Sequence, residues 1–315
     1  MKGEKNKKQH FVPQCYLKNF SLNRKSLWVY NKSKNNNNIY QQSVSNICCK
    51  DDFYSLTEIC REKLFLEKDY FANDIEPLLS NKLKHIIEKG SEYIINKVSS
   101  EIFTSDEKYE FAYLLAIQWF RTPYQKKTIY NLSNDVSCKM IRLFQEGLAI
   151  EKGNDNYRKL NIKPCINPVI EHAERGYMNN DLLESYAKAL ADNYWEFYIT
   201  PQNNVYTSDF PITVKKHCVE AQNTFEGLAC FGSEMTYPIS KNICLTIWDK
   251  DFFQDKKSKD LKFSDMSESD LIHFNLMRYI YSNELYCSEN DFSFIELLPK
   301  LCGKELGTPS IKDNR

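Results

Sequence analysis

The chain has 315 residues, and its 42 Lys and Arg residues balance 42 Asp and Glu residues. A net charge of zero excludes a protein whose main affinity comes from a uniformly basic surface, although it leaves room for a local basic groove. Hydrophobic residues make up 42% of the sequence and aromatic residues 14%, with only 9 Gly and 10 Pro, which excludes a largely disordered chain. No apolar run approaches the roughly 20 residues that span a bilayer, and no apolar segment follows the charged start. We therefore expect a cytoplasmic, globular protein without a membrane partner.

The eleven cysteines show no regular framework, so we expect reduced and mostly buried thiols. A structural zinc site needs a short clamp such as C-x2-C, and the sequence contains none. The vicinal pair Cys48 and Cys49, and Cys218 beside His217, could bind a metal only with ligands from distant segments.

The N-terminal part of the chain begins with a lysine-rich leader, residues 1–9, which we expect to be flexible. Residues 27–30 (LWVY) predict a strand, residues 34–38 a polar turn, and residues 39–40 the start of a return strand, which together form a hairpin. Apolar residues at three-to-four spacing between 64 and 87 then predict one or two amphipathic helices.

The strongest helix signal lies between residues 104 and 148. Thr104 and Glu107 form a capping box ahead of an aromatic, apolar run. Pro123 cannot donate a backbone hydrogen bond and disfavours the helical conformation of Thr122, so the first helix stops or kinks there. Thr122 can itself cap a second helix that has Pro at its first position and Gln125 at its third. We predict a broken helix pair over about 105–148.

The second half of the chain mixes helices and strands. Residues 151–180 are irregular and are the best candidate for an internal boundary. Further elements are predicted in chain order: a helix over 181–194, strands at 195–199, 205–207, 212–214 and 243–248, a turn at Pro238, a helix over 267–281, and a short strand near 292–298. The predicted fold class is α+β, mainly helical, with a small antiparallel β component from the N-terminal hairpin and the 195–248 region. One compact domain over 10–315 is preferred to two.

A first motif surrounds His10, in the string HFVPQCYLKNF. An H-x-V-P string resembles the first histidine segment of HNH nucleases, in which a histidine is the general base beside a metal ion. The second half of that motif is missing, because the next histidine is His85 on a predicted helix. The alternative is a histidine that hydrogen-bonds to the backbone and orders the N-terminal segment.

A second motif comprises Gln118, Arg121 and Thr122, whose spacing places them on one side of a helix end. A guanidinium group suits bidentate binding of a phosphate or a carboxylate. The alternative is an internal salt bridge that fastens the helices to the β part.

A third motif is the Thr-Ser-Asp run ending in Asp209, which Pro211 terminates. It exposes a carboxylate and two hydroxyls on a rigid turn, a platform for metal binding or general-base catalysis, but Asx turns use the same residues structurally. Glu67 and Glu76 are further acidic candidates. Their spacing of nine places them on opposite sides of a straight α-helix, so we do not expect a local pair.

Together, the strings HFVPQCYLKNF, LWVY, DDFY, IQWFRTP and TSDFP, followed by a late helix with Asn275, resemble the bacterial family catalogued as domain of unknown function 4238. Order and spacing fit along nearly the whole chain. The family has no established activity to transfer, and by analogy its polar positions from remote segments imply one shared pocket. The matching positions are His10, Pro13, Gln14, Gln118, Arg121, Thr122, Pro123, Ser208, Asp209 and Pro211.

Two hypotheses of function follow. In the first, the protein is a hydrolase of phosphodiesters or nucleotides: Asp209, with Glu76, holds Mg²⁺ or Mn²⁺, His10 transfers a proton and Arg121 neutralises the phosphate. The substrate contacts would then come from Gln14, Gln118, Thr122 and Ser208. In the second, the same polar residues form a structural network, and an aromatic surface binds a ligand or a partner protein. The sequence alone leaves the substrate, the partner and the oligomeric state open.

Overall fold

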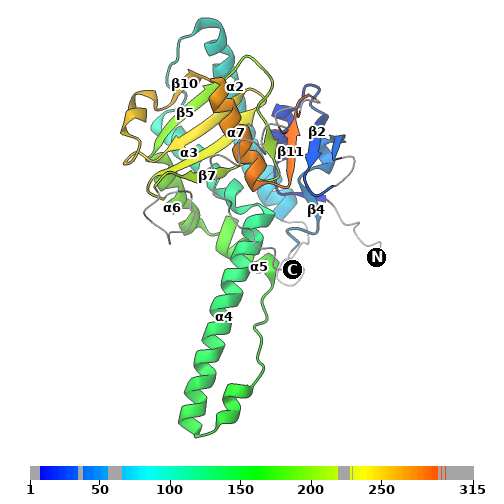
Figure 1. Ribbon diagram of the computed structural model, residues 1–315, viewed down its shortest axis with the longest axis vertical. Coiled ribbons are helices and arrows are strands. Elements are labelled where there is room, and N and C mark those ends of the chain that lie inside the picture. Colours follow the sequence, from blue (N-terminus) through cyan, green and yellow to red (C-terminus); the bar gives the residue numbers. More distant parts are fainter. Residues whose placement is uncertain are drawn as a thin grey trace.

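The structure is a computed structural model that describes residues 8–34, 38–55, 66–218, 228, 230–289, 292 and 295. Its architecture is α+β with helices in the majority, as predicted (Figure 1). The predicted leader lies almost entirely outside the described residues. Among the helices that the described ranges contain, none is long and apolar enough to cross a membrane.

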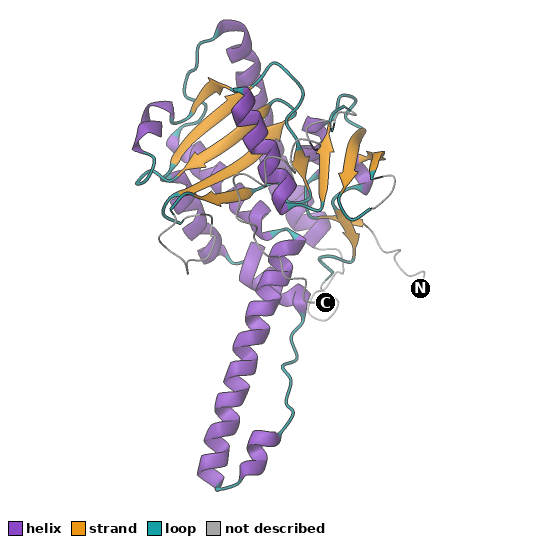
Figure 2. Cartoon of the chain, viewed as in Figure 1, coloured by secondary structure: helices purple, strands orange, loops and turns teal. Residues whose placement is uncertain are grey.

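The strands form three separate sheets (Figure 2). A two-stranded sheet has the order β1-β4, a four-stranded sheet the order β3-β2-β11-β6, and a five-stranded sheet the order β10-β5-β9-β8-β7. Neighbouring strands are antiparallel except for the β10–β5 pair, which is parallel. The strands are β1 (Lys8–His10), β2 (Ser26–Asn31), β3 (Ile39–Ser43), β4 (Cys49–Asp51), β5 (Tyr194–Ile199), β6 (Thr207–Ser208), β7 (Thr213–Lys216), β8 (Ser233–Ser240), β9 (Ile243–Trp248), β10 (Lys262–Asp265) and β11 (Glu284–Cys287).

Helical segments surround these sheets. The α-helices are α1 (Gln14–Leu17), α2 (Glu76–Asn96), α3 (Ser105–Phe120), α4 (Pro123–Lys152), α5 (Pro168–His172), α6 (Asn180–Ala191) and α7 (Glu268–Tyr281). Short 3-10 segments are η1 (Lys18–Phe20), η2 (Val44–Asn46), η4 (Asp155–Lys159) and η6 (Gln254–Lys259), and π-helical segments are η3 (Leu66–Ile75) and η5 (Ala173–Tyr177).

The five-stranded sheet is covered on both faces. Alternate residues of β8 and β9 such as Tyr237 and Leu245 join the main hydrophobic core with residues of α2, α3 and α6. On this side α2 approaches closely, since a Cβ on Gly90 would lie 2.8 Å from the Ile243 side chain. The other face carries polar side chains and is crossed by α7 (Figure 1), where Phe274 packs against Tyr198.

The broken helix pair is confirmed. The capping box of Thr104 and Glu107 starts α3, and the Thr122 hydroxyl accepts a hydrogen bond from the Gln125 N–H at the start of α4. Helix α4 runs four residues beyond the predicted end and stops at Gly153, whose left-handed φ of +60° terminates the helix at low steric cost.

Helix α4 projects from the body as an arm (Figure 2). The 151–180 region, predicted as an internal boundary, forms η4, an extended stretch, α5 and η5, which lead the chain back along α4. We call α4 with the returning residues 153–167 the helical arm.

One prediction about the strands needs correction. Pro238 does not form a turn but lies inside β8, at a bulge between Pro238 and Ser240, where the register shift tolerates a residue without an N–H. Within the described residues the last strand is β11, whereas the strand predicted near 292–298 lies in a segment largely outside the described residues. Strand β11 joins the N-terminal hairpin to β6, so segments more than 170 residues apart in sequence share one sheet.

Candidate functional site

Arg121 is the centre of a buried polar network at the C-terminal end of α3. The Arg121 Nη2 donates both to the carbonyl oxygen of His10 at 2.8 Å and to the Glu76 carboxylate at 2.9 Å. Its Nε donates to the Tyr54 hydroxyl at 3.2 Å, and that hydroxyl lies 3.2 Å from the Arg121 carbonyl oxygen. The network therefore ties the N-terminal segment, the 54 region and α2 to the end of α3.

Arg121 is only 1% exposed, and its guanidinium lies over the Phe71 ring at 3.8 Å. Burial by itself disfavours the charged form, but Tyr54 and Glu76 outweigh it and raise the pKa of Arg121 above its usual value. Arg121 thus stays charged and holds a carboxylate, as the structural alternative for the second motif predicts.

Both glutamates contribute to this network through different partners, although the spacing predicts them on opposite sides of a straight α-helix. Glu76 pairs with Arg121, and Glu67 accepts a hydrogen bond from the His10 N–H at 3.4 Å. The error has a geometric cause: the segment between them is the π-helix η3, in which nine residues complete about two turns rather than two and a half. Burial raises the pKa of Glu67, and the Arg121 charge opposes that rise.

His10 lies at the end of β1 and is 6% exposed. Its ring Nε2 is buried without a hydrogen-bond partner among the described residues. Burial lowers the pKa of His10, and the nearby Glu76 charge opposes this shift. Burial therefore favours the neutral imidazole. The buried Oε2 of Glu67, in the same network, also has no hydrogen-bond partner among the described residues.

The remaining residues of the first two motifs lie around the same segment. Gln118 donates its side-chain N–H to the Phe11 carbonyl at 3.1 Å, one residue after the carbonyl that Arg121 binds. Thr122 is the cap of α4, and Gln14 is the half-buried first residue of α1. Gln118 and Arg121 therefore recognise consecutive peptide groups of the N-terminal segment.

Asp209 has a different set of partners. Its Oδ1 accepts hydrogen bonds from the backbone N–H groups of Asn283 and Glu284, at 3.0 and 3.2 Å, and the buried Ser208 hydroxyl accepts one from the Phe210 N–H. Burial raises the pKa of Asp209 to about 6, against the effect of these hydrogen bonds. The Thr-Ser-Asp turn thus anchors the start of β11.

The structure therefore joins His10, Glu67, Glu76 and Arg121 in one network by direct contacts, while the contacts of Asp209 described above lead to β11. Within the described residues, no group of three or more His, Cys, Asp or Glu side chains has the arrangement to hold a metal ion. The nine cysteines of the described part carry no disulfide.

Sequence reasoning missed a polar cluster on the face of the five-stranded sheet that α7 crosses. Glu234 of β8 binds the rings of His217, just after β7, and His273 of α7. The signal that could have found it is the alternation of polar and apolar residues in Ser233–Ser240, which places Glu234 on the face away from the core. The turn expected at Pro238 prevented this segment from being predicted as a strand.

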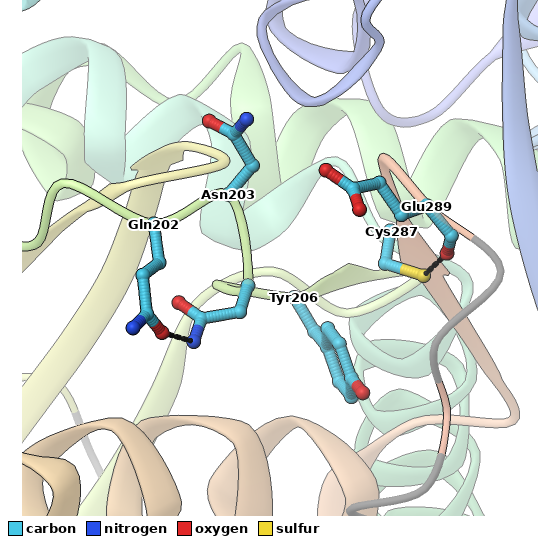
Figure 3. Close-up of a pocket in the computed structure, with 6 residues that line it drawn as sticks. Gln202, Asn203, Tyr206, Cys287 and Glu289 are labelled. Atoms are coloured by element: carbon cyan, nitrogen blue, oxygen red, sulfur yellow. Dashed lines mark hydrogen bonds between the residues drawn. The ribbon is translucent and has the colours of Figure 1, made fainter.

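A separate pocket of about 380 Å³ lies beyond the ends of β5 and β11. In Figure 3, Gln202 and Asn203 lie on one side of the pocket, Cys287 and Glu289 on the other, with Tyr206 between them. The buried Asn204 Oδ1 has no hydrogen-bond partner among the described residues. The pocket offers amide and thiol groups and contains none of the predicted site residues.

Comparison with known protein families identifies the family of the chain. A family model matches residues 8–285. The chain belongs to the family described as Protein of unknown function (DUF4238). The match extends from β1 to β11, and thus includes both the Arg121 network and the Asp209 turn of this DUF4238 chain. No curated protein and no solved structure matches it.

Proposed function

We propose that this chain is a binding module whose Arg121 network is structural and whose helical arm associates with a second copy of the chain. The enclosure of Arg121 supports the structural role. Arg121 is 1% exposed, and its Nε and Nη2 already donate to the Tyr54 hydroxyl, the His10 carbonyl and Glu76, so a phosphate would have to displace these buried partners to bind either nitrogen. The exposed apolar surface that could bind a partner lies on α4 instead.

The observation that carries the proposal is an apolar stripe on α4. Six large apolar side chains of the helix are between 47% and 74% exposed. They are Leu132, Val136, Met140, Leu143, Phe144 and Ile150. With Gly147, their positions fall within about one third of the helix circumference, on the side away from the buried Gln145 and Ala149 that face the returning chain. Contiguous apolar surface of this kind marks an interaction site.

A second copy fits this surface in area and in symmetry. The six side chains expose on the order of 700 Å², close to the ~800 Å² that each partner buries in a standard interface. A two-fold axis near Met140 and Leu143 would place the same stripe against itself in antiparallel orientation. The arm of 30 helical residues is about 45 Å long, so the two bodies would lie at opposite ends of the seam without clashing.

The test is the oligomeric state of the purified chain, measured by sedimentation velocity over a range of concentrations. We expect a dimer in the wild type and a monomer in Leu132→Asp combined with Leu143→Asp, because each dimer would bury four carboxylates in an apolar seam. The matched control is Leu78→Asp, since Leu78 is exposed to a similar extent, 56% against 60% for Leu132, but lies on α2. This control should remain dimeric.

A wild type that stays monomeric up to its solubility limit would overturn the self-association. A dimer that survives both arm substitutions would show that the contact lies on another surface, and would equally refute the assignment of the stripe. Circular dichroism of all variants establishes that the arm remains helical.

A further inference from the structure

The polar cluster on the outer face of the five-stranded sheet has an unusual composition. Glu234 is 2% exposed, and each of its carboxylate oxygens binds one imidazole: Oε2 lies 2.7 Å from Nε2 of His217, and Oε1 lies 2.6 Å from Nε2 of His273. The histidine side chains are themselves 28% and 27% exposed. One buried carboxylate therefore orients two imidazoles that reach the solvent.

Glu234 is ionised in this arrangement. Burial would raise its pKa, but the hydrogen bonds from His217 and His273 outweigh it and lower the pKa to about 2. An ionised carboxylate accepts hydrogen bonds only, so both imidazoles present Nε2–H to it, and Nδ1 is left as the ring nitrogen that can gain or lose a proton. A carboxylate fixes the tautomer of a catalytic histidine in the same way in hydrolases.

Buried polar atoms beside the cluster have no hydrogen-bond partner in the described part of the chain. Trp248 is the cross-strand neighbour of Glu234, and Thr246 is that of Thr236, so both side chains lie on the same face of the sheet as Glu234. The Trp248 Nε1 and the fully buried Thr246 Oγ1 have no hydrogen-bond partner among the described residues. An unpaired buried donor and acceptor at one place indicate a site that a ligand or water completes.

A row of aromatic rings leads from the surface to this cluster. Phe231 and Phe252 are 59% and 40% exposed, with ring centroids 5.5 Å apart, and Phe252 contacts Phe253 at 4.8 Å. Phe253 in turn contacts the rings of His217 at 5.2 Å and Trp248 at 4.8 Å. Exposed aromatic faces of this kind stack the bases of single-stranded nucleic acid.

Lys256 is a partly exposed cation near the cluster, in addition to the fully buried Arg278, which donates to Thr236 on the same face of the sheet. The Lys256 Nζ is 4.7 Å from the centroid of the Trp248 ring and 3.7 Å from the Glu196 carboxylate. Its side chain is 26% exposed, so it is able to contact an anionic group from solvent. A phosphate that approaches the histidines could pair with the Lys256 ammonium group, which lies next to the Glu196 carboxylate.

We propose that His217 and His273 form an acid–base pair that cleaves single-stranded RNA without a metal ion. The neutral imidazole takes the proton of a ribose 2′-hydroxyl at Nδ1, and the 2′-oxygen forms a bond to phosphorus. The protonated imidazole gives its proton to the 5′-oxygen as the bond from that oxygen to phosphorus breaks. The products are a 2′,3′-cyclic phosphate and a free 5′-hydroxyl, and a proton exchange with water restores the pair. Glu234 is a positioning residue, because it acts through the two rings.

The test uses a fluorescent single-stranded RNA oligonucleotide in EDTA, with DNA of the same sequence as the substrate that lacks the 2′-hydroxyl. We expect RNA cleavage with 2′,3′-cyclic phosphate ends and intact DNA. His217→Asn and His273→Asn should each lower the cleavage rate at least about 100-fold, the usual contribution of general acid–base catalysis. His85→Asn, prepared identically, is the matched control, because His85 binds a backbone carbonyl of residue 102 rather than a carboxylate.

Two further variants keep the proposal falsifiable if a histidine variant folds poorly. Phe252→Ala removes an exposed ring and should raise KM more than it lowers kcat, and Glu234→Gln should change the pH profile of cleavage. Intact RNA with the wild type, or equal cleavage by the wild type and the His217→Asn protein, would overturn the proposal. A lower melting temperature of the histidine variants with unchanged cleavage would show a structural role only, and would overturn it as well.

Discussion

Replacement of Arg121 tests the structural interpretation of the predicted site most directly. Arg121→Ala removes the guanidinium and leaves the Glu76 carboxylate, which is 23% exposed at its side chain, without its cation. The same change leaves the His10 carbonyl and the Tyr54 hydroxyl without a donor, and removes the cation from the Phe71 ring. Every one of these losses acts on the folded state.

The expected magnitude follows from the loss of one partner from a buried ion pair. Such a loss costs about 3–5 kcal/mol, because an uncompensated buried charge remains. The second substitution Glu76→Gln in the Arg121→Ala background removes that charge, so we expect it to restore part of the lost free energy of unfolding. Glu76→Gln alone should destabilise less than Arg121→Ala, because Glu76 is partly hydrated.

Urea unfolding followed by tryptophan fluorescence measures these differences, with a constant slope against urea as the sign that the variants are compared on the same transition. The matched control is Arg158→Ala. Arg158 also pairs with carboxylates, those of Glu146 and Asp155, but its side chain is 39% exposed. Pairs of this kind contribute about 0–1 kcal/mol.

A loss below about 1 kcal/mol for Arg121→Ala would refute the reasoning, because it would mean that the buried network contributes no more than a surface pair. A stable Arg121→Ala protein that no longer acts in cells would point back to Arg121 as a functional group. The variant that combines Arg121→Ala with Glu76→Gln separates the cost of the uncompensated Glu76 charge from the loss of side-chain packing, because the second substitution removes only the charge.

Two pH-dependent predictions complete the set. Burial lowers the pKa of His172 to about 3. Between this value and about 6.5, the usual pKa of histidine, the unfolded chain binds one proton more than the folded chain. The free energy of unfolding should therefore fall by about 1.4 kcal/mol for each pH unit of acidification in this range. Urea unfolding of His172→Gln between pH 7 and 4.5 should show a shallower slope, and parallel curves would contradict the assignment. For Asp209, whose pKa burial raises to about 6, the folded chain binds the extra proton, so acidification through pH 6 should stabilise the wild type relative to Asp209→Asn. At pH 8 Asp209→Asn should unfold at the same or a higher urea concentration than the wild type, whereas Asp209→Ala should cost about 1–3 kcal/mol, because the N–H groups of Asn283 and Glu284 lose their acceptor.

Local signals account for the parts of the fold that could be predicted. The capping box at Thr104, the break at Pro123 and the hairpin of β2 and β3 depend on residues within a few positions of one another. Their energetics are largely the same in any tertiary context, so periodicity and cap residues suffice to predict them.

Elements that depend on remote partners escaped prediction. The sequence pattern of Ser233–Ser240 contains a proline, and only the neighbouring strands β7 and β9 establish it as a strand. Likewise, η3 winds as a π-helix rather than an α-helix, and this winding brings Glu67 to the same side as Glu76. The prediction from residue spacing assumed a regular α-helix and therefore placed the two glutamates on opposite sides.

The sequence by itself determined the α+β class, the helix boundaries around residue 122, and the motif residues on which the resemblance to the family rests. Only the tertiary structure decided which partners those residues have, because the solvation of a polar group depends on which remote segment covers it. Burial against Phe71 and pairing with Glu76 make Arg121 part of a buried polar network, and packing of α7 across the sheet places His273 and His217 on either side of Glu234. Such contacts join segments separated by 17 to 111 residues, and local sequence patterns do not encode them.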